Sequence, residues 1–314
     1  MKQSFVLLLF GLAFVVGCSS SGGPQVTPTG FMSTGSMGTA RLIHTATLLG
    51  DGKVLVAGGQ LDVTHLLATA ELYDPASGSF RPTGSMRAGR SHQTATLLKD
   101  GKVLVAGGAT QTEGNAVATA ELYDPASGTF TPTGNMTTAR SNHTATLLSN
   151  GKVLVTGGLN PTLNELAMAE QFDPASGTFT PTGSMSTARF NHTATLLNSG
   201  RVLVTGGDHS ATAELFDPTT GSFTATGSMS TARAEHAATL LKDGTVLATG
   251  GQDPTGNEVT LAELFDSTTD SFRTTGSMGT AREYHTSTLL NDGKVLVTGG
   301  VNGTGALATA ELFE

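Results

Sequence analysis

The sequence predicts an all-β fold, a six-bladed β-propeller made of four-stranded antiparallel blades. One stretch recurs six times, with copies that begin at Met37, Met86, Met136, Met185, Met229 and Met278. A repeat of this length is typical of propellers and solenoids. The 314 residues include 41 glycines and many Thr and Val, a composition that suits strands and tight turns. Each copy holds four short strand signals separated by turn residues, which is one blade.

The first copy shows how each blade is predicted. Residues 45–49 and 54–56 flank Gly50-Asp51-Gly52, whose residue types tolerate the positive φ of a hairpin turn. Residues 68–73 predict the third strand and residues 79–83 the fourth, with a tight turn between them. A Gly-Gly doublet ends the second strand of every copy and indicates close backbone approach or unusual φ where the blades converge; the doublets are at 58–59, 107–108, 157–158, 206–207, 250–251 and 299–300.

The two ends of the repeat region indicate a closed ring. The last copy stops at Glu314, after its third strand, while Phe31 lies six residues before Met37, as Phe80 lies six before Met86. Residues 30–35 therefore read as an unattached fourth strand. We expect this N-terminal strand to complete the sixth blade, because that closure leaves no exposed sheet edge. An open solenoid would instead carry polar capping repeats.

The first 29 residues differ from the repeats. Lys2 and the apolar run 5–16 have the pattern of an export signal and are too short to span a bilayer. Residues 15–18, Val-Val-Gly-Cys, resemble the bacterial lipoprotein processing box, so we expect a signal peptide at 1–17 and lipidation of Cys18. Residues 18–29 then form a flexible tether, with the propeller at 30–314. The alternative is a plain secretory signal with a chance cysteine.

Charge and cysteine content restrict the partners. Cys18 is the only cysteine, so the propeller has no thiol for a disulfide. The formal net charge is −8, and it becomes −9 when Lys2 is removed with the signal. This balance argues against nucleic acid and against an anionic membrane surface as partners. We expect a monomer that contacts the membrane only through its lipid anchor, at the bacterial outer membrane or cell surface, and that needs no cofactor.

The repeat is similar to the kelch repeat. It contains Arg-x-x-His, a Gly-Gly doublet after an apolar strand, and Glu-x-Tyr-Asp-Pro followed by an aromatic residue. The resemblance covers essentially all of residues 30–314, although phenylalanines such as Phe80 stand where kelch proteins usually have Trp, and Ser267 replaces the proline after Asp266. It implies a six-bladed propeller and says little about function, because this architecture serves both enzymes and binding modules.

Blade topology locates the expected working face. In an up-and-down blade, the loops between the second and third strands share one end with the junctions between blades, and these loops vary between copies. Long, differing loops on a rigid scaffold are where binding residues usually lie. The alternative is that they are only solvated loops. The candidate residues are Asp62, His65, Glu113, Asn160, Glu165, His209, Asp253 and Glu258.

Two further residue types recur once in nearly every copy. The kelch resemblance implies that the junction arginines Arg41, Arg90, Arg140, Arg189, Arg233 and Arg282 line a pocket for an anionic group. The alternative, which the sequence favours, is internal pairing with the third-strand glutamates Glu71, Glu121, Glu170, Glu214, Glu263 and Glu311. The histidines at 44, 143, 192, 236 and 285 are one per blade, so they favour structural hydrogen bonding over a metal site.

These observations favour a protein- or glycan-binding interaction module at the cell envelope over an enzyme. A galactose oxidase-like copper enzyme is excluded, because it needs a cysteine joined to a tyrosine. A carbohydrate-active enzyme such as a sialic acid mutarotase, which is also a six-bladed kelch protein, remains the first alternative. The second is a structural spacer, which suits such uniform repeats. None of the hydrolase, metalloprotease or phosphate-binding motifs is present.

Overall fold

The computed structural model describes residues 34–62, 64–110, 115–207 and 210–314. In these ranges the chain forms strands, turns and loops, and the all-β prediction is confirmed. None of these ranges contains a helix long and apolar enough to cross a membrane.

The strands group into blades in chain order. The first blade is β1 (Thr45–Leu48), β2 (Val54–Ala57), β3 (Ala70–Asp74) and β4 (Ser79–Pro82). The second is β5 (Thr94–Leu97), β6 (Val103–Ala106), β7 (Ala120–Asp124) and β8 (Thr129–Pro132). The third is β9 (Thr144–Leu147), β10 (Val153–Thr156), β11 (Ala169–Asp173) and β12 (Thr178–Pro181).

The remaining blades follow the same plan. The fourth is β13 (Thr193–Leu196), β14 (Val202–Thr205), β15 (Ala213–Asp217) and β16 (Ser222–Ala225). The fifth is β17 (Ala237–Leu240), β18 (Val246–Thr249), β19 (Leu261–Asp266) and β20 (Ser271–Ser277). The sixth is β21 (Thr286–Leu289), β22 (Val295–Thr298) and β25 (Ala310–Phe313), with a small hairpin of β23 (Val301–Asn302) and β24 (Gly305–Ala306).

Each blade is an antiparallel sheet whose strands neighbour one another in chain order. In the first blade Thr45 pairs with Ala57, and Tyr73 pairs with Phe80. The second strands of blades 2 to 5 are buried along their whole length. They are therefore nearly continuous apolar runs such as Val-Leu-Val, as expected for strands covered on both faces.

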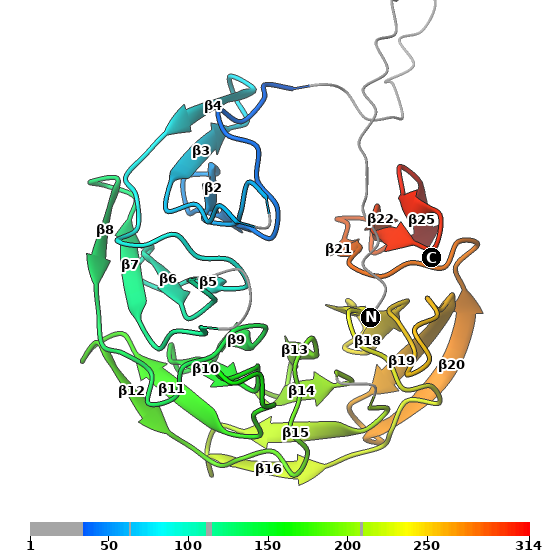
Figure 1. Ribbon diagram of the computed structural model, residues 1–314. Coiled ribbons are helices and arrows are strands. Elements are labelled where there is room, and N and C mark those ends of the chain that lie inside the picture. The colour runs from blue at the N-terminus through cyan, green and yellow to red at the C-terminus, as the bar shows by residue number, and fades with distance from the viewer. Residues whose placement is uncertain (1–33, 63, 111–114, 208–209) are drawn as a thin grey trace, which may run out of the picture.

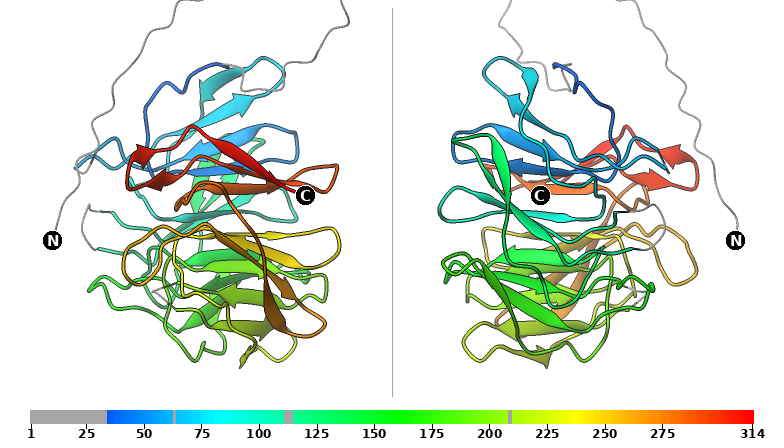
Figure 2. Two further views of the ribbon diagram at one scale, coloured as in Figure 1. Left: turned by 90° about the vertical axis from the view of Figure 1, so that its right-hand side faces the viewer. Right: turned by 60° about the vertical axis from the view of Figure 1, so that its left-hand side comes forward.

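The blades are arranged around a ring as a six-bladed propeller, as predicted (Figure 1). The first strand of each blade is innermost, and β1, β5, β9, β13, β17 and β21 contact one another in that order. Figure 2 shows the ring from the side, with the strands crossing its thickness and the connecting loops at its two faces.

The hydrophobic core lies between neighbouring blades. Leu55 and Ala57 of the first blade, for example, pack with Val103, Val105 and Tyr123 of the second. Four further clusters join the other consecutive pairs of blades. In four of the five clusters, the aromatic residue of a third strand is among the largest apolar side chains. These residues, Tyr123, Phe172, Phe216 and Phe265, are fully buried. Adjacent blades therefore hold each other in place.

The Gly-Gly doublets have the role that the sequence predicts. Both glycines have positive φ in every blade, for example 62° at Gly157 and 96° at Gly158. A Cβ atom on Gly157 would lie 2.4 Å from the Arg189 carbonyl oxygen of the next blade. The second glycine uses this proximity, because the Gly158 N–H donates to that same carbonyl at 2.8 Å. Only glycine fits such a contact without strain.

The predicted closing strand is only partly within the described residues. Residues 30–33 lie outside them, and the sixth blade has three strands in the described part of the chain. Residues 34 and 35, however, contact the first blade. Thr34 Oγ1 lies 2.8 Å from Tyr73 Oη, and the Gly35 N–H donates to the Gly78 carbonyl at 2.7 Å.

Candidate functional site

One face of the ring carries the variable segments. We call it the loop face, meaning the junctions before each inner strand together with the loops between second and third strands. The two are joined by single β-bridges such as Ser141 to Leu159, Ala234 to Gln252 and Glu283 to Val301. The opposite face, with the short turns inside each hairpin, is called the turn face.

The loop residues that the sequence selects mostly shape their own loops. Asp62 Oδ1 accepts from the Thr64 hydroxyl and from the backbone N–H groups of Thr64 and His65. The Thr64 hydroxyl and N–H, with the His65 ring, lower the pKa of Asp62. Asn160 and Asp253 accept from backbone N–H groups of their own loops in the same manner. Glu165 and Glu258 each form a β-bridge across their loops. Glu113 and His209 lie outside the described residues.

The six junction arginines lie inside the blades rather than on the loop face. Their side chains are at most 2% exposed. Each donates to the third-strand glutamate of its own blade at 2.8 to 3.1 Å, which is the internal pairing that the sequence favours. Arg140 also donates to the carbonyls of Gly157 and Met168. The guanidinium groups therefore join the junction to the third strand of their own blade. Because they are buried in this position, they do not contact a ligand on the surface.

The recurring histidines join neighbouring blades. His143 Nε2 lies 3.1 Å from Thr94 Oγ1 of the preceding blade, and His236 Nε2 lies 3.0 Å from Thr193 Oγ1. Burial and the nearby arginines lower the pKa of His192 and His236 to about 3. In the second blade Gln93 takes this position and donates to the Ala57 carbonyl of the first blade. The described residues contain no group of three or more potential metal ligands.

The residue two positions after each junction arginine has an unusual backbone conformation. All six have left-handed φ, from 51° to 59°, and none is glycine. We call this set the inner ring; its members are Ile43, His92, Asn142, Asn191, Glu235 and Tyr284. Left-handed φ is costly for residues with a side chain, and for a β-branched or bulky residue it is a genuine outlier.

Backbone hydrogen bonds join the inner ring from blade to blade. Asn142 N–H donates to the His92 carbonyl, and Asn191 N–H donates to the Asn142 carbonyl, at 3.2 and 3.3 Å. Glu235 and Tyr284 continue the chain at 3.0 and 3.1 Å. Each member lies two residues before an inner strand. The backbone therefore forms a chain of hydrogen bonds on the loop face that runs from His92 in the second blade to Tyr284 in the sixth.

The side chains of the inner ring form a polar network. Glu235 Oε1 accepts from Asn191 Nδ2 at 2.7 Å and from the Tyr284 hydroxyl. Desolvation of the hydroxyl, with the hydrogen bond and charge of Glu235, raises the pKa of Tyr284. Burial lowers the pKa of His92, which also senses the charge of Glu235. His92 and Glu235 therefore belong to one electrostatic environment, although they come from the second and fifth blades.

Glu283 lies directly before Tyr284 and completes this group. It is 8% exposed, and its Oε2 is buried without a hydrogen-bond partner in the described chain. Burial, a hydrogen bond that the protonated Glu283 shares with the Glu235 carboxyl group, and the charges of Glu235 and Glu258 raise the pKa of Glu283 to about 7. A carboxyl group poised to exchange a proton near neutral pH is a feature of functional sites.

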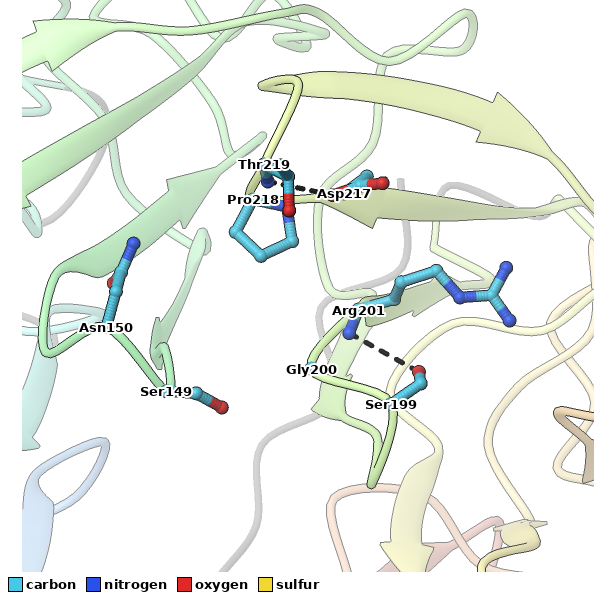
Figure 3. A pocket seen from close by; sticks show the side chains of 8 residues that line it. All are labelled: Ser149, Asn150, Ser199, Gly200, Arg201, Asp217, Pro218 and Thr219. Carbon is cyan, nitrogen blue, oxygen red and sulfur yellow. Dashed lines mark hydrogen bonds between the residues drawn. The ribbon is translucent and has the colours of Figure 1, made fainter.

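The turn face is hollowed between blades in a regular way. Figure 3 shows one such hollow between the third and fourth blades; its lining is Ser149, Asn150, Ser199, Gly200, Arg201, Asp217, Pro218 and Thr219. Equivalent hollows lie between blades 1 and 2 and between blades 5 and 6. Their recurrence follows from the spacing of the blades, so they do not single out a site.

Sequence reasoning missed the inner ring. The available signal was variation: the position between arginine and histidine holds five different residue types in otherwise similar copies. The loops were selected because their lengths differ between the six copies, whereas the inner-ring position differs between copies only in side-chain type.

The fold and the site define a six-bladed propeller with a polar ring on its loop face, and comparison with known proteins adds the fold alone. No protein-family model and no curated protein matches the chain. Solved structures do match. One described as "Structure of YjhT" has a TM-score of 0.69 and 16% sequence identity, over 88% of this chain and 95% of that chain. At this identity the likeness shows the propeller architecture.

Proposed function

We propose that the protein is a binding module for a protein or glycan, and that the inner ring holds its ligand. One observation carries this proposal. Five different side chains occupy a backbone conformation that is left-handed in all six copies, while the arginine beside them never changes. Strain held in place by the surrounding fold is a mark of functional sites. A spacer without a ligand would have no need for this diversity.

A uniform-ring variant tests the proposal. Ile43, His92, Glu235 and Tyr284 are all replaced by Asn, the residue already present at positions 142 and 191. Asn tolerates left-handed φ, so the variant keeps its fold. The full chain is presented to a glycan array and to an envelope extract, beside this variant. We expect a defined glycan or protein to be retained by the parent and lost by the variant.

A matched control places four Asn residues on the turn face, at Asp51, Asp100, Asp243 and Asp292, where Asn150 is the natural precedent. This control should retain the ligand. If the uniform-ring variant still retains the ligand, the binding site lies outside the inner ring. If neither the parent nor the variant captures a ligand, the result supports a structural spacer.

The cellular setting belongs to the same proposal. We propose export directed by residues 1–17 and lipid attachment at Cys18, which hold the propeller at the bacterial envelope. The support is the sequence pattern alone. Metabolic labelling with a fatty acid tests it: the parent should carry label in the membrane fraction, and Cys18→Ser should not. Unlabelled parent protein would contradict lipid attachment.

A sugar mutarotase is the second candidate, favoured by one observation. Glu283, with its pKa at about 7, can donate and accept a proton at neutral pH, as anomer exchange requires. The full chain should then speed anomer exchange of N-acetylneuraminic acid in an NMR exchange experiment, and Glu283→Gln should abolish the effect. If the sugar binds but its anomer exchange is not accelerated, the result supports the binding module rather than the mutarotase.

A further inference from the structure

Glu283 differs from every other buried glutamate in the described chain. Each third-strand glutamate that is buried receives an arginine Nη2 and backbone N–H groups; Glu170, for example, accepts from Arg140, Thr137 and Thr138. Glu283 is buried to a similar extent, yet its Oε2 receives no N–H or O–H from the described chain, and its carboxyl group can hydrogen-bond that of Glu235 only while one of the two is protonated. An unpartnered buried carboxyl oxygen is costly, because it loses water without gaining a hydrogen bond.

Among the described residues, the charged groups that act on Glu283 are acidic. Its charged neighbours are Glu235 and Glu258, and Tyr284 lies beside it as a further acidic group. The neighbouring arginines are committed elsewhere, since Arg233 pairs with Glu263 and Arg282 pairs with Glu311. This part of the inner ring therefore has excess negative charge.

From these contacts we infer that the part of the inner ring between blades 5 and 6 binds an ammonium group, carried either by an amino sugar or by a lysine side chain. This inference rests on the proposed function and names the chemistry of its ligand. An ammonium group has three N–H donors. One can take the place of the proton that Glu283 shares with Glu235, and the positive charge of the ammonium offsets the negative charge of the two carboxylates.

Tyr284 supplies the second element of recognition. The residue is 62% exposed although its hydroxyl is bonded to Glu235, so much of it is accessible to a ligand beside the two carboxyl groups. A cation over an aromatic face gains further electrostatic attraction. An anionic ligand would meet uncompensated carboxyl groups here, so an ammonium site at Glu283 argues against the second candidate above, which would place a sugar acid at the same residue.

Binding should strengthen as pH rises, because the ammonium group competes with the proton on Glu283. With the pKa of Glu283 at about 7, roughly one site in ten is deprotonated at pH 6. The apparent Kd at pH 6 should therefore be about tenfold weaker than the intrinsic value. At pH 8 the carboxyl group is ionised and the weakening disappears.

Calorimetry of the full chain with matched probes tests the inference. The cationic probes are methyl 6-amino-6-deoxyglucoside and Nα-acetyl-lysine amide, whose amines are largely protonated at pH 8 and which distinguish an amino sugar from a lysine side chain. Their neutral partners are methyl 6-acetamido-6-deoxyglucoside and Nα,Nε-diacetyl-lysine amide, and the anionic probe is N-acetylneuraminic acid. We expect one cationic probe to bind at pH 8, about tenfold more weakly at pH 6, with no binding of its neutral partner.

Two variants complete the design. Glu283→Ser copies Ser91 and Ser141 at the same repeat position, so its fold has a precedent within the chain. It should weaken cation binding at least tenfold and remove the pH dependence. Asp62→Asn removes the same charge from the same face while keeping the Oδ1 acceptor of its loop, and it should bind like the parent.

The outcomes separate this inference from the proposed function. Equal binding of a neutral probe, or unchanged binding in Glu283→Ser, would overturn the ammonium site while leaving the binding module in place. Failure of both cationic probes to bind at pH 8 would also overturn it, and retention of a glycan in the uniform-ring experiment would then identify a different ligand chemistry.

Discussion

Ile43 is the clearest strained residue of the inner ring. It is β-branched and has a φ of 53°, a region where such residues are rare. Because its side chain is 43% exposed, little packing is lost when it is replaced. We expect Ile43→Asn to stabilise the protein by about 1 kcal/mol, because Asn accepts left-handed φ. Urea unfolding measures this, with Ile43→Val as the control that keeps the strain; equal stabilities of the two variants would refute it.

The buried ion pair of the third blade gives a second residue-level prediction. Arg140 and Glu170 lie 2.8 Å apart with side chains 0% and 1% exposed. Arg140→Met leaves the Glu170 carboxylate buried without its cation, so we expect a loss of about 3 to 5 kcal/mol in unfolding free energy. Arg201→Met, which removes the exposed pair with Asp270, should cost less than about 1 kcal/mol. Similar losses in the two variants would mean that burial of the pair is unimportant.

The inter-blade histidines make stability depend on pH. In the folded chain the pKa of His236 is about 3, below its ordinary value of 6.5. Between these values the unfolded state binds more protons, so stability falls as pH decreases from 6.5 toward 3. His236→Gln copies Gln93, which bonds the preceding blade without titrating. The variant should reduce the slope of unfolding free energy with pH by about 1.4 kcal/mol per unit between pH 4 and 6.

The control for this measurement is Gln93→His, which adds a histidine at the equivalent buried position of the second blade. It should increase the slope between pH 4 and 6. A slope that stays unchanged in Gln93→His would show that burial between blades is not the cause.

At the scale of elements, the junction between second strand and loop depends on its first glycine. A Cβ atom on Gly157 would lie 2.4 Å from the Arg189 carbonyl oxygen and 2.8 Å from His192 Cε1. Gly200, in a turn of the next blade, also has positive φ, but the nearest atom to its Cβ position is 3.9 Å away. Gly200→Ala should therefore cost only about 1 to 2 kcal/mol of backbone strain.

Gly157→Ala adds a collision between blades to that strain, so we expect it to cost about 1 to 3 kcal/mol more than Gly200→Ala. Thermal and urea unfolding of the two variants give the difference. If both alanines cost the same, the doublet serves only its φ angles and the contact between blades is loose.

At the scale of the whole molecule, the repeat determines what the sequence can reveal. The blades, the Gly-Gly doublets and the internal pairing of arginine with glutamate all recur, so six copies reinforce each prediction. The inner ring does not recur in side-chain type, and its left-handed backbone is adopted by residues as different as Ile43, Asn142 and Tyr284, so the side chains do not reveal it. The closeness of Glu235 and Glu283, in different blades, likewise appears only once the ring is assembled.

Ring closure is the remaining prediction at this scale. Thr34 and Gly35 contact Tyr73 and Gly78 of the first blade as Thr83 and Gly84, which follow β4 of the first blade, contact Tyr123 and Gly128 of the second. By this analogy, the residues just before Thr34 belong to the blade that precedes the first one in the ring, which is the sixth. Phe31 would then meet Phe313, as Phe80 meets Tyr73 with ring centres 4.8 Å apart.

Phe31→Ala should therefore destabilise the full chain by about 3 kcal/mol or more if its ring is buried there. Phe80→Ala removes the equivalent ring from the first blade and sets the scale for a strand known to be in place. The two variants are compared by urea unfolding, which is monitored through the backbone NMR signals of Phe313. A Phe31→Ala protein as stable as the parent, with Phe80→Ala clearly weakened, would mean that the N-terminal segment does not complete the sixth blade.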